Sequence, residues 1–182
     1  MKRIVLIFGV ISGLISSALM FLTLPFMHDQ MVENGTGYIV GYTSIFLSFL
    51  LVFFGIRSYR ENSGGTISFG RGVAVGLLIT LISCVFYVAS WQVIYYKMMP
   101  DFADRYSAAE MNKLRKEGAS AEQMAAKAKD MQQMKDILEN PVLNVAMTFI
   151  EPFPVGLVVT LVSAAVLRKR NPAAVAGVAQ TV

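Results

Sequence analysis

The sequence predicts an all-α membrane protein with four transmembrane helices in a compact bundle. Mean hydropathy is +0.55 and 55% of the 182 residues are hydrophobic, well above an ordinary soluble domain. The apolar residues also form four runs near the ~20 residues needed to cross a ~30 Å hydrocarbon core. The first three runs contain no charged residue and the fourth contains only Glu151. The runs are 4–24, 38–56, 73–96 and 142–166.

The first run follows Met1-Lys2-Arg3, the arrangement that also opens a signal peptide. This run has roughly 21 residues against the 7–15 of a signal-peptide core, and no A-x-A cleavage site follows it. We therefore interpret it as a retained span within a single membrane domain, 1–170. The remaining residues, 171–182, are small and apolar and are expected to be a flexible tail.

Basic residues at the ends of the runs predict the orientation of the chain in the membrane. The 25–37 connection has no Lys or Arg, so we expect it outside and both termini in the cytoplasm. The 97–140 connection, also expected outside, carries eight basic residues balanced by eight acidic ones. These basic residues weaken the orientation prediction, because orientation follows the number of Lys and Arg residues and not the net charge. The basic residues expected on the cytoplasmic side are Lys2, Arg3, Arg57, Arg60, Arg71, Arg168, Lys169 and Arg170.

A polar insert, 101–140, separates the third and fourth runs and is expected to form an extracytoplasmic helical hairpin. Ser107 to Glu110 and Ser120 to Gln123 match the capping box that starts a helix, and Gly118 is placed to end the first one. An apolar stripe at helical spacing follows, formed by Met124, Ala128, Met131, Met134 and Leu138.

The stripe must be covered, and three partners are open. It can pack on the first hairpin helix through Met111 and Leu114, lie on membrane lipid, or dock on another chain. The 107–139 hairpin is therefore a candidate contact for a protein partner or a homo-oligomer.

Small residues predict where the helices approach one another, since lipid tails are as apolar as Leu and helices associate mainly through close contact. Each run has such a face. The candidate packing residues are Gly9, Gly13, Gly72, Gly76 and Gly156.

Glu151 is the candidate functional residue, because a carboxylate at the centre of a span costs about 2.5–3.5 kcal/mol on insertion. It lies beside Pro152 and Pro154, which interrupt helical hydrogen bonding. Three interpretations are open: an ion or proton site, an interfacial residue with a shorter span from Pro152 to Val166, or a neutral acid hydrogen-bonded across the bundle. The hydroxyl residues expected at its depth are Ser16, Ser17, Ser44, Tyr87 and Ser90.

No constellation for catalysis, a cofactor or a metal is complete. With one His and one Cys, the standard triads and zinc sites are unavailable, so we expect no enzyme. His28 lies with Met27, Asp29 and Met31, side chains that bind copper, but their position favours an interfacial flank. The net charge of +4 is not arranged as a basic patch interleaved with aromatic residues, which argues against nucleic acid.

Three segments carry a family resemblance: Ser68-Phe-Gly-Arg-Gly72, Phe149-Ile-Glu-Pro-Phe-Pro-Val-Gly156 and Leu161-Val-Ser-Ala-Ala-Val-Leu-Arg168. With the polar insert between the first and second of these segments, the chain resembles the bacterial four-span inner-membrane family catalogued as domain of unknown function four-one-nine-nine. The resemblance extends from about Lys2 to Arg170. It implies a bacterial cytoplasmic membrane and a stand-alone domain, and it carries over no catalytic or ligand residue.

Two functional hypotheses follow. The leading one is a non-enzymatic membrane protein whose outer hairpin or bundle surface engages another protein or lipid, based on the missing catalytic constellations and the uncovered Met stripe. The alternative is a small transporter or proton-coupled carrier that uses Glu151.

Overall fold

The computed structural model describes residues 1–24 and 36–169. The expectations for His28 and its neighbours and for the tail 171–182 lie outside the described residues.

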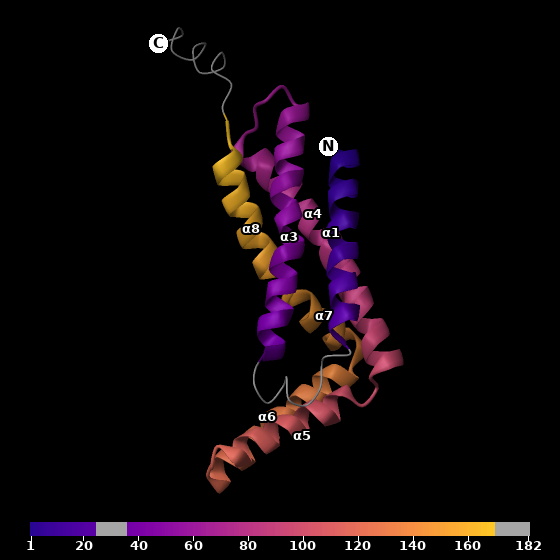
Figure 1. Ribbon diagram of the computed structural model, residues 1–182, viewed down its shortest axis with the longest axis vertical. Coiled ribbons are helices and arrows are strands. Elements are labelled where there is room, and N and C mark those ends of the chain that lie inside the picture. Colours follow the sequence, from indigo (N-terminus) through magenta and orange to yellow (C-terminus); the bar gives the residue numbers. More distant parts are fainter. Residues whose placement is uncertain (25–35, 170–182) are drawn as a thin grey trace.

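Four helices in the described ranges are long and apolar enough to cross a membrane, so the predicted all-α, four-span fold is confirmed (Figure 1). The N-terminus, the α3–α4 turn and the end of α8 lie at one end, and the polar insert lies at the other. The spans are α1 (Lys2–Thr23), α3 (Thr36–Asn62), α4 (Phe69–Val93) continued by the π-helical turn η2 (Ile94–Met98), and the pair α7 (Pro141–Ile150) and α8 (Pro152–Leu167).

The second helix is longer than its apolar run and ends at Asn62 rather than near residue 56. A polar turn extends it, in which Arg57 Nε donates to Glu61 Oε1 at 2.9 Å, one helical turn away. Hydropathy identifies only the apolar part of a helix that can lie in the hydrocarbon core, so this polar extension was not predicted.

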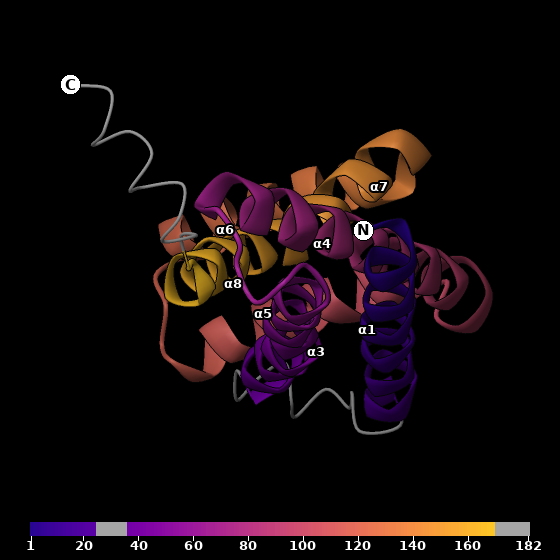
Figure 2. The same ribbon diagram turned by 90° about the horizontal axis from the view of Figure 1, so that it is seen from above.

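Helix α4 lies at the centre of the bundle and packs against α1, α3 and α8 (Figure 2). Its Val75 and Ile79 are fully buried, as are Val52 and Ile56 of α3. The hydroxyls of Thr80 on α4 and Thr160 on α8 are 3.2 Å apart, which adds a hydrogen bond between the two helices. The side chains of α4 therefore determine how the other spans are spaced.

The five glycines singled out in the sequence are buried where helices meet. A Cβ atom on Gly13 would lie 2.6 Å from Cγ of Phe86, and one on Gly9 would lie 2.9 Å from Cβ of Ile82. On the other side of α4, a Cβ on Gly76 would lie 2.7 Å from Cγ2 of Thr160. Gly72 faces Ala164 and Gly156 faces Thr80 in the same way.

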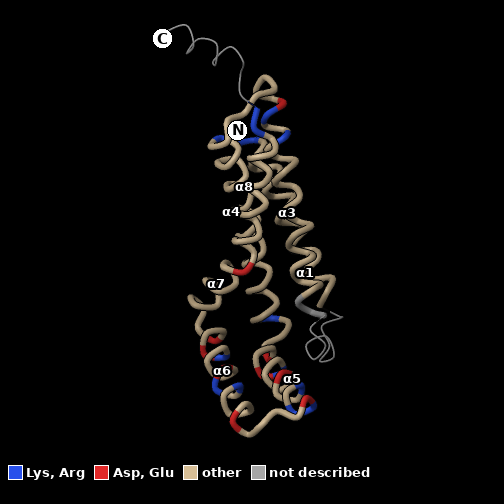
Figure 3. The backbone as a smooth tube through the Cα atoms, turned by 90° about the vertical axis from the view of Figure 1, so that its left-hand side faces the viewer, with Lys and Arg blue, Asp and Glu red and all other residues tan. Residues whose placement is uncertain are grey.

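The end of the bundle that holds the N-terminus is closed by backbone pairing. Ile67, in the α3–α4 turn, exchanges two 3.0 Å hydrogen bonds with Lys169, just after α8. Arg60 Nη1 donates to the carbonyl of Leu167 at 3.4 Å. Lys and Arg gather at this end, whereas both charge signs alternate over the insert (Figure 3).

The insert consists of α5 (Phe102–Lys116) and α6 (Ala121–Glu139), which pack on each other. The expectation that Ser107 starts the first helix is wrong, because α5 begins at Phe102 and includes Ser107. Glu110 is buried instead and pairs with Lys127 of α6 at 2.8 Å. The second capping box, Ser120 with Gln123, is confirmed, and Gly118 adopts the positive φ of a helix stop.

The Met stripe of α6 is partly covered by α5. Met131 is 7% exposed, whereas Met134 remains 37% exposed. Lys135 Nζ donates to Asp104 of α5 at 2.6 Å, and this hydrogen bond raises the pKa of Lys135. Of the five stripe residues, Met131 is therefore buried, whereas Ala128 and Met134 remain exposed.

Replacing Gly13 with Leu should destabilise the bundle, because the side chain would overlap Phe86 at the α1–α4 contact. Overpacking of this kind costs about 1–3 kcal/mol. The matched control is Gly41→Leu, because a Cβ on Gly41 meets nothing within 4 Å. Thermal unfolding in detergent should show a lower midpoint for Gly13→Leu than for the wild type and for Gly41→Leu. Equal midpoints would mean that Gly13 does not lie at a close helix contact.

Candidate functional site

The fourth span is interrupted at Glu151, between α7 and α8. Pro152 and Pro154 follow directly and cannot donate backbone hydrogen bonds, and their rings clash with carbonyls one turn earlier. Proline suits the first turn of a helix, where donors are unpaired, so the same residues that end α7 begin α8. The two helices consequently do not share an axis (Figure 1).

Glu151 lies well inside the fourth span. At 1.5 Å per residue, the 10 residues of α7 place it about 15 Å from the insert, and the 16 residues of α8 place it about 24 Å from the opposite end. Both distances are a large part of a ~30 Å hydrocarbon core. The carboxylate therefore belongs to the interior of the span if α7 and α8 cross the membrane together.

Tyr87 of α4 contacts this carboxylate. Its hydroxyl donates to Glu151 Oε2 at 3.0 Å. The Glu151 side chain is exposed on the outside of the bundle, whereas the neighbouring Pro152 is buried. The acid thus lies at the edge of the α4–α8 contact, with one protein donor shown in the described chain.

The other hydroxyl residues expected beside Glu151 lie elsewhere. Ser90 Oγ donates to Ser17 Oγ at 2.7 Å, which links α4 to α1. Ser44 Oγ donates to the carbonyl of Val40 at 2.8 Å in its own helix. Ser16 faces a small cavity that Tyr87 also lines. Of the predicted neighbours, Tyr87 alone is shown to bind the carboxylate in residues 1–24 and 36–169.

Asn144 of α7 organises a hydrogen-bond network that sequence reasoning missed. It is fully buried, and its Oδ1 accepts from Trp91 Nε1 at 3.1 Å and from Gln92 Nε2 at 3.0 Å. Its Nδ2 donates to the carbonyl of Leu138 at 2.8 Å, and Thr148 Oγ1 donates to its carbonyl at 2.7 Å. This network connects α7 to α4 and to the end of α6.

A sequence signal for the network does exist. Asn144 and Thr148 are four residues apart inside an apolar run, so they share one face of a helix. Trp91 and Gln92, which bind Asn144, lie near the end of the third run, but nothing in the sequence indicates which helix they meet.

Residues 1–24 and 36–169 contain no group of three His, Cys, Asp or Glu side chains that could hold a metal ion. Cys84 is buried within α4 as a free thiol.

A family model described as protein of unknown function (DUF4199) matches residues 7–169. The chain belongs to this family. The match runs from α1 past the end of α8, so this family domain includes Glu151, Tyr87 and Asn144. Comparisons with curated proteins and with solved structures found no match. The family description names no activity, so the function must be argued from the geometry.

Asn144→Ala should destabilise this family domain by about 1–3 kcal/mol, because buried donors of Trp91 and Gln92 lose their acceptor. Hydrogen bonds between membrane helices average somewhat less, about 0.6 kcal/mol each, which argues for the lower part of that range. The control is Asn112→Ala on the exposed face of α5. Chemical or thermal unfolding in detergent measures both; an unchanged stability of Asn144→Ala contradicts the role of the network.

Proposed function

We propose that this chain is a non-enzymatic multi-pass membrane protein that binds and releases a proton at Glu151, as a small proton-coupled carrier does. The observation that carries the proposal is the hydrogen bond from Tyr87 to a carboxylate at a break inside the fourth span. We therefore prefer the carrier hypothesis to the docking role of the hairpin.

The energetic argument concerns the location of the acid. A carboxylate at the centre of a span costs about 2.5–3.5 kcal/mol on insertion scales, and such residues are generally kept for function. Interrupted helices in transporters expose backbone groups and acids at the same depth. Here Pro152 and Pro154 produce the interruption directly beside Glu151.

Tyr87 suits an acid that changes protonation state. A phenol hydroxyl both donates and accepts, so it can donate to the carboxylate and accept from the protonated acid. The 3.0 Å contact needs only a rotation of two O–H bonds to serve either state. A fixed cation at this position would hold Glu151 permanently ionised, which would oppose proton exchange.

A docking role for the hairpin is the second candidate. Its support is Met134, which remains 37% exposed on α6. It ranks second because Met131 is buried and the charged residues Lys127 and Lys135 pair within the hairpin, which leaves less surface for a partner. Contact with lipid, a protein partner or a second copy through 107–139 stays a prediction.

The proposal places the chain in a bacterial cytoplasmic membrane with both termini in the cytoplasm. In support, the described basic residues outside 97–140 lie at one end of the bundle (Figure 3). Translocating Lys and Arg near span ends is disfavoured, so this end is expected to remain in the cytoplasm.

Reporter fusions test this orientation. A reporter active only in the cytoplasm should be active after Arg170 and inactive in the turn near Gly118, because the end of α8 and the α5–α6 turn lie at opposite ends of the bundle. A reporter active only in the periplasm should give the opposite pattern. Periplasmic activity after Arg170 contradicts the proposed topology.

Glu151→Gln tests the proton site. The carboxamide keeps the size of the side chain and a hydrogen bond to Tyr87, so the fold should survive while the titratable group is lost. In lipid vesicles, infrared spectra are recorded between acid and alkaline pH for the wild type and for Glu151→Gln. The other acidic residues contribute to both spectra, so the Glu151 band is the pH-dependent carboxyl component that is present in the wild type and absent from Glu151→Gln.

The matched control is Glu61→Gln, which removes an exposed carboxylate from the polar end of α3 and should retain the band. Glu151→Leu adds a test of depth, because a residue among lipid headgroups should tolerate it and one bound inside the span should lose stability. A wild-type spectrum without the pH-dependent band rejects the proton site, and equal stability of both Glu151 variants supports an interfacial residue.

A further inference from the structure

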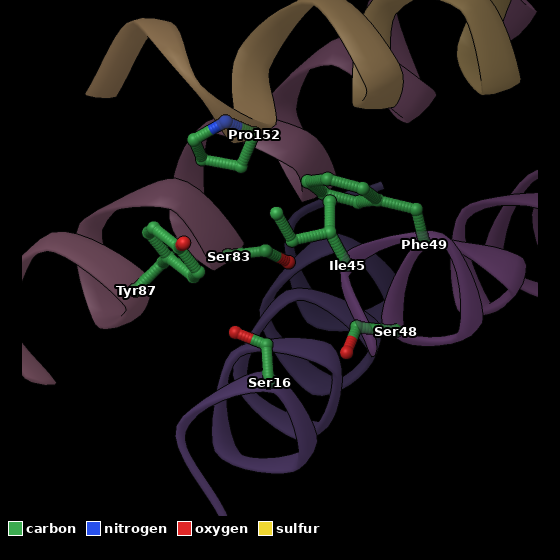
Figure 4. A pocket seen from close by; sticks show the side chains of 7 residues that line it. All are labelled: Ser16, Ile45, Ser48, Phe49, Ser83, Tyr87 and Pro152. Carbon is green, nitrogen blue, oxygen red and sulfur yellow. The ribbon is translucent and has the colours of Figure 1, made fainter. Parts of the chain in front are cut away.

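A small cavity lies between α1, α3 and α4, on the inner side of Tyr87 (Figure 4). The space open to the centre of a water molecule is about 10 Å³. Four hydroxyl residues from three helices line it, together with apolar side chains. The lining residues are Ser16, Ser48, Ser83 and Tyr87, with Ile45, Phe49 and Pro152.

Ser16 is the unusual member of this group. Its side chain is 7% exposed, and its Oγ has no hydrogen-bond partner in residues 1–24 and 36–169. Figure 4 shows this hydroxyl directed into the space between the helices. A buried hydroxyl without a partner costs about 1–3 kcal/mol, and more where no water from the bulk can reach it. A ligand that accepts from Ser16 would remove this penalty.

The other three hydroxyls already use their protons on acceptors within the protein, but each oxygen keeps a lone pair that can accept. The cavity therefore offers one free donor and several acceptors. The existing bonds run from Ser48 Oγ to the Ser44 carbonyl at 2.8 Å, from Ser83 Oγ to the Ile79 carbonyl at 3.0 Å, and from the Tyr87 hydroxyl to Glu151 at 3.0 Å.

We infer that this cavity binds one water molecule, which accepts a hydrogen bond from Ser16 and donates to the hydroxyl oxygen of Tyr87. The volume suits a single water, for which about 10–15 Å³ by this measure is needed, and excludes a larger solute. A buried water needs two to four polar partners, and the hydroxyls of the wall supply them. An entirely apolar cavity of this size would stay dry.

The water extends the hydrogen-bond chain of Glu151 into the bundle. When Glu151 is ionised, the water donates to the Tyr87 oxygen while the phenol donates to the carboxylate; when Glu151 is protonated and donates to Tyr87, the water turns and accepts from the phenol. The chain then runs from Ser16 of α1 through the water and Tyr87 of α4 to the fourth span. This consequence rests on the proposed function, whereas the water site itself does not.

Crystal structures grown from lipid, at a resolution that shows ordered water, test the site. The wild type should show one water within hydrogen-bond distance of Ser16 Oγ, and Ser16→Ala should lose it. The matched control is Ser17→Ala on the same helix, because Ser17 pairs with Ser90 and does not line the cavity. This control should keep the water.

The inference is overturned by an empty cavity in the wild type or by a water that persists in Ser16→Ala. It is also overturned by an electron-density peak whose occupancy depends on sodium concentration, because that peak would be a sodium ion and not a water. The wild-type structure alone decides the first of these, so the result does not depend on the folding of a variant. For the link to Glu151, the infrared carboxyl band should shift in Ser16→Ala and not in Ser17→Ala. An ordered water without a pH-dependent Glu151 band supports the water site and rejects the proposed proton function. A pH-dependent Glu151 band without the water supports the proton function and rejects the water site.

Discussion

The close approach of α4 to its neighbours is the constraint on which the rest of the structure depends. Gly13 admits the Phe86 ring on the α1 side, and Gly76 admits Thr160 on the α8 side, at distances that leave no room for a Cβ atom. Lipid provides no hydrophobic drive for helix association, so close packing and hydrogen bonds between helices must provide it. The same approach brings Tyr87 of α4 to the beginning of α8, where Glu151 lies.

Polar groups inside the spans show how the bundle satisfies hydrogen bonds without bulk water. Asn144 binds Trp91 and Gln92 across a helix contact, and Ser17 pairs with Ser90. Each of these interactions joins two helices, so polar residues in the apolar runs add specificity to the packing. Ser16 differs because its hydroxyl is buried without a partner in the part of the chain that the structure describes. Glu151 differs because it is a carboxylate at the surface of the bundle.

The hairpin shows what helical periodicity leaves undecided. The stripe on α6 predicted an apolar face with three possible partners; α5 and α6 pack on each other, and Met131 of the stripe is buried whereas Met134 is exposed. The pairs Lys127–Glu110 and Lys135–Asp104 align the two helices. The expectation that Ser107 and Glu110 form a capping box was wrong. Ser107 lies within α5, and Glu110 pairs with Lys127 of α6 instead of capping the start of a helix.

Run length, proline geometry and side-chain size are local properties, so the four membrane-length helices, the break at Glu151 and the small residues at close contacts could be predicted without a structure. Only the tertiary structure decided which hydroxyl meets Glu151, which donors meet Asn144 and that Ser16 has no partner among the described residues. Hydropathy places a residue at a depth in the membrane but leaves the rotation of each helix about its axis open. Ser17 and Tyr87 were equivalent by depth, and helix rotation directed one to Ser90 and the other to the carboxylate.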